Sequence, residues 1–160
     1  MAGKRRVVFI CSRNAARSQM AEGFLRSLYG MSYDAASAGL RSFRVSRTAT
    51  RVMKEAGIDI STHRSRSIGE LAGEKFDLVV TLCEEAASAP RSLLPPGDGY
   101  LHQEFPDPAN FRGDEKEILE AYRNLRDQMG SWIREQFGPG GPAAEADLSP
   151  RPPTPDLQKT

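Results

Sequence analysis

One stretch of sequence decides how this chain folds: Val7-Val8-Phe9-Ile10-Cys11-Ser12-Arg13-Asn14-Ala15-Ala16-Arg17-Ser18. The run before Cys11 is β-branched and aromatic without polar alternation, which predicts a buried parallel strand. Residues 18–29 predict a helix, because apolar side chains recur at helical spacing at Met20, Phe24, Leu25 and Leu28. The loop between them points free backbone N–H groups and the positive end of the helix dipole at whatever it encloses. This unit therefore predicts an anion site.

Two side chains of this loop, Cys11 and Arg17, are suited to covalent chemistry on a tetrahedral anion. A helix N-terminus and a nearby cation stabilise a thiolate, and the planar guanidinium can bind two oxygens. We expect Asn14 to be left-handed and Ser18 to donate its hydroxyl to the sulfur. The spacing alone leaves another interpretation open, a small buried Cys11 beside a solvated Arg17. The expected oxyanion site is the whole loop: Ser12, Arg13, Asn14, Ala15, Ala16 and Arg17.

Strands and helices alternate along the rest of the chain. Further strands are expected at 33–38 and 100–105, and 76–82 is a second buried strand that delivers Cys83 at its carboxyl end. Further helices are expected at 46–56, 67–71 and 114–137. Such alternation predicts an α/β fold, with a mostly parallel sheet and helices on both faces. Ligands of these sheets bind beyond the carboxyl ends of the strands, where we expect both cysteines.

The composition argues against a nucleic-acid-binding protein, a membrane protein and a disulfide-rich secreted protein. The 160 residues suit one domain, residues 1–137, and the Gly/Pro-rich residues 138–160 are expected to form a disordered tail. The 22 Lys and Arg nearly balance the 21 Asp and Glu, so no net field favours nucleic acid or an anionic membrane. No apolar run approaches the roughly 20 residues of a membrane span. Two cysteines do not make a secreted disulfide framework. We therefore expect a cytoplasmic protein.

A covalent adduct on Cys11 needs an acid for the departing oxygen. Asp107, between two prolines in Glu104-Phe105-Pro106-Asp107-Pro108-Ala109, is the best candidate. An ordinary Asp-Pro turn remains the alternative. The two histidines, His63 and His102, have no cysteine or carboxylate at metal-ligand spacing, so no metal centre is expected.

At these residues the chain resembles a known family, the low-molecular-weight tyrosine phosphatase superfamily, and within it the arsenate reductase branch. The resemblance covers about residues 6–137. Its motifs run in family order: Cys11 to Ser18, Gln19-Met20-Ala21-Glu22-Gly23, Ser37-Ala38-Gly39, Gly57-Ile58-Asp59-Ile60-Ser61, Val79-Val80-Thr81-Leu82-Cys83 and Asp107-Pro108-Ala109.

The resemblance implies a three-layer domain with a four-stranded parallel sheet in the order 2-1-3-4. It implies Cys11 as nucleophile, Arg17 as oxyanion clamp and Asp107 as general acid. In the reductases a second cysteine, at the position of Cys83, attacks the arsenate adduct, so that arsenite leaves and a Cys11–Cys83 disulfide remains. The alternatives are a phosphatase acting on phosphotyrosine or aryl phosphates through phosphocysteine, and a non-enzymatic phosphate-binding or thiol-sensing module. Neither enzyme needs a bound cofactor.

The chain departs from the family pattern at several positions. The thioredoxin-coupled reductases carry a third cysteine where this chain has Ala89, so the disulfide must be opened by an external donor such as thioredoxin, glutaredoxin or a low-molecular-weight thiol. True phosphatases usually place an aromatic residue where Ala109 stands. Arg13 replaces a small loop residue and is expected to attract a dianion. The family's potassium site is matched only in part, by Asn14, Glu22 and Ser37, with Arg64 and Arg66 replacing its Thr and Asp ligands.

Overall fold

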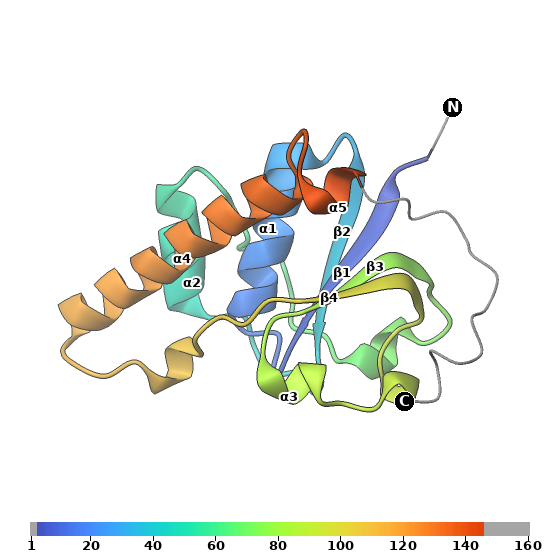
Figure 1. Cartoon of the computed structure of the whole chain (residues 1–160). Coiled ribbons are helices and arrows are strands. Elements are labelled where there is room, and N and C mark those ends of the chain that lie inside the picture. The colour runs from blue at the N-terminus through green and yellow to red at the C-terminus, as the bar shows by residue number, and fades with distance from the viewer. Residues whose placement is uncertain (1–2, 146–160) are drawn as a thin grey trace.

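The computed structural model describes residues 3–145, whose core is one parallel sheet with helices on both faces (Figure 1). The strands follow the order β2-β1-β3-β4, and every pairing is parallel. The α/β class and the strand order expected from the sequence are thereby confirmed. The strands are β1 (Arg5–Cys11), β2 (Tyr33–Gly39), β3 (Phe76–Thr81) and β4 (Gly97–His102).

Strand β1 is central because its side chains serve two cores at once. Val7 and Phe9 join the cluster formed with α1, α2 and α4, whereas Val8 and Ile10 join the cluster on the opposite face. All four side chains are fully buried. A strand buried on both faces has no polar alternation, which is why its sequence reads as a continuous apolar run.

The helices divide between the two faces of this sheet. The first cluster packs α1, α2 and α4 on one face, and the second cluster covers the other face with shorter segments that include α3. No helix within residues 3–145 is long and apolar enough to cross a membrane. The helices are α1 (Arg17–Tyr29), α2 (Arg47–Glu55), α3 (Glu84–Ala87), α4 (Glu115–Phe137) and α5 (Pro142–Glu145), with 3₁₀ turns at Ile68–Leu71, Arg91–Leu93 and Pro108–Asn110.

The structure corrects the expected start of the tail at residue 138. Residues 138–145 continue the fold and end in α5, with Ala143 buried against the first core cluster. The Arg5 guanidinium donates hydrogen bonds of 3.1 Å to the carbonyls of Ala143 and Ala144, so the start of β1 holds this segment. Because this segment is held by one buried alanine and by hydrogen bonds to its carbonyls, its sequence has no apolar periodicity from which a helix could be predicted. The rest of the expected tail, residues 146–160, lies outside the described residues.

The second half of the sheet also differs in detail from the expectation. Strand β4 begins at Gly97 rather than at residue 100, and ends at His102 rather than at residue 105. It is an edge strand that pairs only with β3, so few of its side chains need to be buried and its sequence carries a weak signal. The short helix α3 was not expected. It begins directly after Cys83, which is its N-cap residue.

Candidate active site

The loop between β1 and α1 lies at the carboxyl edge of the sheet. Cys11 is the last residue of β1 and Arg17 is the first residue of α1. The loop is tied to the chain that follows β2, because the backbone N–H groups of Leu40 and Arg41 donate to the carbonyls of Cys11 and Ser12 at 3.0 and 3.1 Å. The thiol and the guanidinium six residues apart in sequence are thus held at the two ends of one loop.

Asn14 fixes the shape of this loop. Its φ of 52° is left-handed, as its residue type predicted. Its side-chain amide donates to Ser18 Oγ at 2.7 Å and to Ser37 Oγ at 2.9 Å. Because Ser18 Oγ already accepts this hydrogen, its own hydroxyl hydrogen is available to Cys11 Sγ, 2.9 Å away. A hydrogen bond donated to sulfur supports the thiolate form that acts as a nucleophile.

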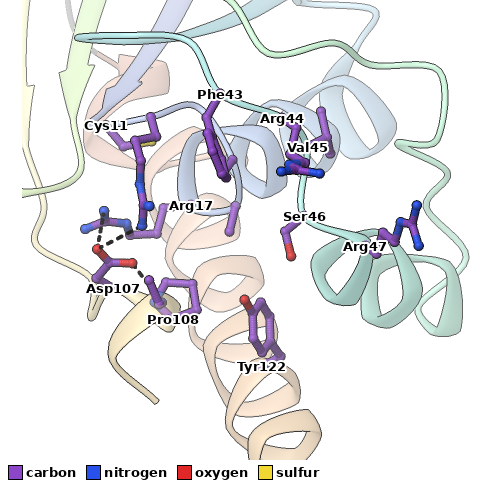
Figure 2. Close-up of a pocket in the computed structure, with 14 residues that line it drawn as sticks. Cys11, Arg17, Phe43, Arg44, Val45, Ser46, Arg47, Asp107, Pro108 and Tyr122 are labelled. Atoms are coloured by element: carbon purple, nitrogen blue, oxygen red, sulfur yellow. Dashed lines mark hydrogen bonds and ion pairs between the residues drawn. The ribbon is translucent and has the colours of Figure 1, made fainter. Parts of the chain in front are cut away.

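Arg17 and Asp107 face each other at the entrance to the loop (Figure 2). Arg17 Nη2 lies 3.4 Å from Asp107 Oδ2, and Arg13 Nη2 lies 3.9 Å from the same oxygen. The Arg17 side chain is only 7% exposed, so its charge is held in a largely desolvated position. Asp107 caps the 3₁₀ turn Pro108–Asn110, with Oδ1 accepting from the N–H of Ala109 at 2.9 Å. The candidate acid therefore lies beside the Arg17 guanidinium and lines the same cleft as Cys11.

A cleft of about 510 Å³ opens over this loop. Cys11 and Arg17 line its floor, and Asp107 and Pro108 line one side (Figure 2). The rest of the lining comes mainly from the segment that leads into α2 and from α4, two regions far apart in sequence. These further lining residues are Phe43, Arg44, Val45, Ser46, Arg47 and Tyr122.

Cys83 lies beside the oxyanion loop and outside the cleft. Its Sγ is 3.4 Å from Ser12 Oγ, and its residue is 3% exposed. Cys11 and Cys83 belong to the same buried cluster, and both are free thiols in the structure. The topology therefore brings two cysteines that are far apart in sequence into one buried cluster, and Cys83 contacts a side chain of the oxyanion loop.

A family-wide sequence pattern described as low molecular weight phosphotyrosine protein phosphatase matches residues 6–137. This chain belongs to that family. An arsenate reductase of Halalkalibacterium halodurans is 39% identical over 131 residues, covering 82% of this chain and 94% of the relative. The family expected from the sequence, and its arsenate reductase branch, are confirmed.

Solved structures of this family share the fold. A structure of an arsenate reductase in the phosphate binding state has a TM-score of 0.67 at 34% identity, covering 81% of this chain and 94% of that chain. A low molecular weight protein tyrosine phosphatase from T. tengcongensis has a TM-score of 0.66 at 30% identity, covering 81% and 95%. The phosphatase fold of this chain thus occurs in proteins of both names.

In this phosphatase-family protein, Glu22 is buried among positive groups. Its carboxylate accepts from Ser37 Oγ at 2.6 Å and lies 2.6 Å from Arg26 Nη2. His63 Nε2 is 3.7 Å away, and burial, more than any neighbouring charge, lowers the pKa of this histidine. Arg66 donates to the Ser37 carbonyl at 3.3 Å. Two guanidinium groups thus contact Glu22 and Ser37, two of the residues that match part of the family's potassium site.

His102 has neighbours that spacing along the sequence did not reveal. Its Nε2 lies 3.2 Å from Glu104 Oε1, its Nδ1 is 2.8 Å from Thr81 Oγ1, and Glu84 also approaches it. One ligand atom each from Glu84, His102 and Glu104 lies within 4.8 Å of the others. All three residues are exposed, and exposed carboxylates commonly gather in this way without an ion. The group by itself assigns no metal.

Sequence reasoning did not find the outer wall of the cleft. Phe43, Arg44 and Arg47 belong to a basic and aromatic run that could have drawn attention as a binding segment. Tyr122 belongs to the long helix α4 and also lines the cleft. It is held by an edge-on contact with Phe111, whose ring centre is 5.6 Å away. Only the packing of α4 against α2 shows that these residues share a cleft with Cys11.

Proposed function

We propose that this protein reduces arsenate to arsenite, with Cys11 as the nucleophile and Cys83 as the second thiol. The observation that carries the proposal is the position of Cys83, whose Sγ is 3.4 Å from Ser12 Oγ in the oxyanion loop. A phosphatase of this family needs only the first thiol. The names of the relatives at 35–42% identity support the same activity.

In the first step, the Cys11 thiolate attacks arsenic, and one arsenate oxygen departs as water. Arg17 and the backbone N–H groups of the loop bind the remaining oxygens, where charge develops. Asp107, 3.4 Å from Arg17, gives the departing oxygen its proton in this proposal. Ser18 donates a hydrogen bond to sulfur, which supports Cys11 both as nucleophile and as leaving group. This step forms an S–As bond without a change in oxidation state.

The second step transfers the electrons. The Cys83 thiolate attacks Cys11 Sγ, an S–S bond forms, and the S–As bond breaks with its electron pair retained by arsenic. Arsenic is thereby reduced from the pentavalent to the trivalent state, while two thiols become one disulfide. An external thiol donor must then reopen the Cys11–Cys83 disulfide, since Ala89 stands where a third cysteine would act.

Hydrolysis of aryl phosphates is the second candidate function. Phosphate and arsenate share the first covalent step, and the cleft offers aromatic walls in Phe43 and Tyr122. The family name and the 30% identical phosphatase structure favour this activity as well. In this reaction water, rather than Cys83, would attack the adduct on Cys11.

A pair of substitutions separates the two reactions. Cys83→Ser should abolish arsenate reduction and leave hydrolysis of p-nitrophenyl phosphate within about twofold, because serine supplies no electrons but keeps the contact with Ser12. Cys11→Ser should abolish both activities. Arsenite is measured with dithiothreitol as donor, and p-nitrophenolate by absorbance. Normal arsenate turnover by Cys83→Ser would show that the two-thiol mechanism is wrong.

A further inference from the structure

The rim of the active cleft carries positive charge from two arginines. Arg44 and Arg47 line the cleft on the side away from Asp107 (Figure 2). Within residues 3–145, neither guanidinium forms an ion pair with a carboxylate, whereas Arg13 and Arg17 both lie within 4.0 Å of Asp107. The first turn of α2, where Arg47 lies, contains no acidic residue, so the helix dipole adds to this positive charge.

The cleft is also larger than a tetrahedral oxyanion requires. Arsenate would occupy the loop at the floor, whereas a volume of about 510 Å³ falls within the roughly 300–1,000 Å³ typical of sites for organic molecules. Phe43 stands in its wall with 57% of its surface exposed, and the Arg44 guanidinium lies 5.0 Å from the ring centre. The upper cleft therefore offers apolar area together with two cations.

Only one of the two cysteines faces this space. Both cysteines are nearly buried, at 2% and 3% exposure, but Cys11 lines the cleft, whereas Cys83 lies outside the lining and contacts Ser12. A molecule that enters the cleft therefore reaches the sulfur of Cys11 first. This direction of access decides which sulfur of a Cys11–Cys83 disulfide an incoming thiolate can attack, since exchange requires approach to that sulfur.

We infer that the upper cleft binds a low-molecular-weight thiol that carries carboxylate groups, and that this thiol is the reductant. The inference rests on the proposed function. The carboxylates pair with Arg44 and Arg47, and the thiolate attacks Cys11 Sγ. A mixed disulfide forms on Cys11 and Cys83 leaves as a thiolate. A second molecule of thiol attacks the sulfur of the bound one and frees Cys11. Two thiols thus become one disulfide, and their two protons end on the two enzyme cysteines.

Charge selectivity among thiols tests this inference. The enzyme is oxidised with diamide, so that the result does not depend on arsenate turnover, and its reduction is timed with glutathione (anionic), dithiothreitol (neutral) and cysteamine (cationic). For the double substitution Arg44→Gln with Arg47→Gln, the ratio of the glutathione rate to the dithiothreitol rate should fall about fivefold, because each exposed charge pair is weak. The corresponding ratio for cysteamine should rise. Added salt should reduce the ratio for glutathione in the unaltered enzyme.

A matched control separates a local site from a general loss of positive charge. Arg51 lies one turn beyond Arg47 on α2 and lines a neighbouring surface groove rather than the active cleft. Arg51→Gln should leave the ratio unchanged. Peptide mapping after brief exposure to limiting glutathione should find the mixed disulfide on Cys11. Glutathione found on Cys83, or a ratio that changes equally in the Arg51→Gln variant, would overturn the inference.

Binding can be measured without any redox step. S-methylglutathione keeps the carboxylates of glutathione and lacks its thiol, and calorimetry should show that it binds the enzyme more weakly after Arg44→Gln with Arg47→Gln. Equal affinity for both enzymes would also overturn the inference. The proposed function fails by a different result, namely that arsenate does not produce the Cys11–Cys83 disulfide that diamide produces.

Discussion

At the scale of single residues, Asn14 couples the backbone of the oxyanion loop to the reactivity of its sulfur. The left-handed backbone allows one side-chain amide to reach both Ser18 and Ser37, while its oxygen accepts from Gln19 Nε2 at 2.8 Å. These bonds orient the Ser18 hydroxyl toward Cys11. The proposed nucleophile is therefore fixed by a network of hydrogen bonds, and a fixed network reduces the reorganisation that a site needs during reaction.

Asp107 gives the first prediction at this scale. Asp107→Asn should lower turnover of phenyl phosphate at least about a hundredfold, the lower end of what general acids contribute. The loss should be smaller with p-nitrophenyl phosphate, because p-nitrophenolate departs readily without a proton. Steady-state rates with the two esters test this. Asp98→Asn, on the edge strand β4, serves as the control.

If Asp107→Asn lowers the turnover of both esters equally, Asp107 is not the acid and its role is to hold Arg17 in position. The two roles differ in what they predict for binding. A residue that only positions Arg17, 3.4 Å away, should change the affinity for phosphate as much as the turnover. A proton donor should change turnover alone.

At the scale of elements, local patterns were enough to predict the first strand, the first helix and the loop between them. Cys11, Asn14, Arg17 and Ser18 lie within eight consecutive residues, so their geometry follows from one strand–loop–helix unit. The wall of the cleft could not be predicted in the same way. Tyr122 reaches it only through the packing of α4 beside α2, which no local pattern records.

Two elements show why weak patterns mislead. The edge strand β4 has few buried side chains, and α5 is held by carbonyls bound by Arg5 and by one buried alanine, so neither depends on apolar periodicity. The position of Cys83 could be predicted only in part. Its strand was predicted from an apolar run, but its contact with Ser12 depends on the parallel pairing of β1 with β3.

The packing of α2 against α4 gives a pH-dependent prediction. Arg123 donates to both carboxylate oxygens of Glu55 at 2.8 and 2.9 Å, and Arg126 adds a contact of 3.2 Å. These bonds, chiefly those from Arg123, lower the pKa of Glu55 from 4.5 to about 2. A lowered carboxyl pKa stabilises the fold above the unfolded-state value, and this stabilisation disappears as the pH falls toward the folded-state value.

Glu55→Gln should therefore lower the urea midpoint at pH 7, and the difference from the unaltered protein should narrow as the pH falls from about 4.5 to about 2. Urea titrations at pH 7 and pH 3 measure this. Glu120→Gln is the matched control, because Glu120 reaches Arg123 only through one longer contact of 3.4 Å. If the urea midpoints of Glu55→Gln and the unaltered protein differ equally at both pH values, the lowered pKa of Glu55 is contradicted.

At the scale of the whole molecule, parallel pairing places the ends of β1 and β3 at one edge of the sheet. The anion loop follows β1, Cys83 follows β3, and the segment with Asp107 follows β4. Three segments that are dispersed along the sequence, each with a candidate site residue, therefore meet at one edge, where ligands of open α/β sheets generally bind. Because the loop has this shape only in the folded chain, anion binding and folding are thermodynamically linked.

This linkage gives the last prediction. Phosphate at a hundred times its Kd should stabilise the protein by about 2.7 kcal/mol, since the unfolded chain has no such loop. For a domain of this size that corresponds to a rise in Tm of roughly 5–10 °C. Cys11→Ser should keep the rise, because backbone N–H groups and Arg17 bind the anion. Arg17→Met should lose most of it, whatever its own Tm, while Arg51→Gln should keep it. Scanning calorimetry with and without phosphate tests this, and an undiminished rise in Arg17→Met would place the anion elsewhere.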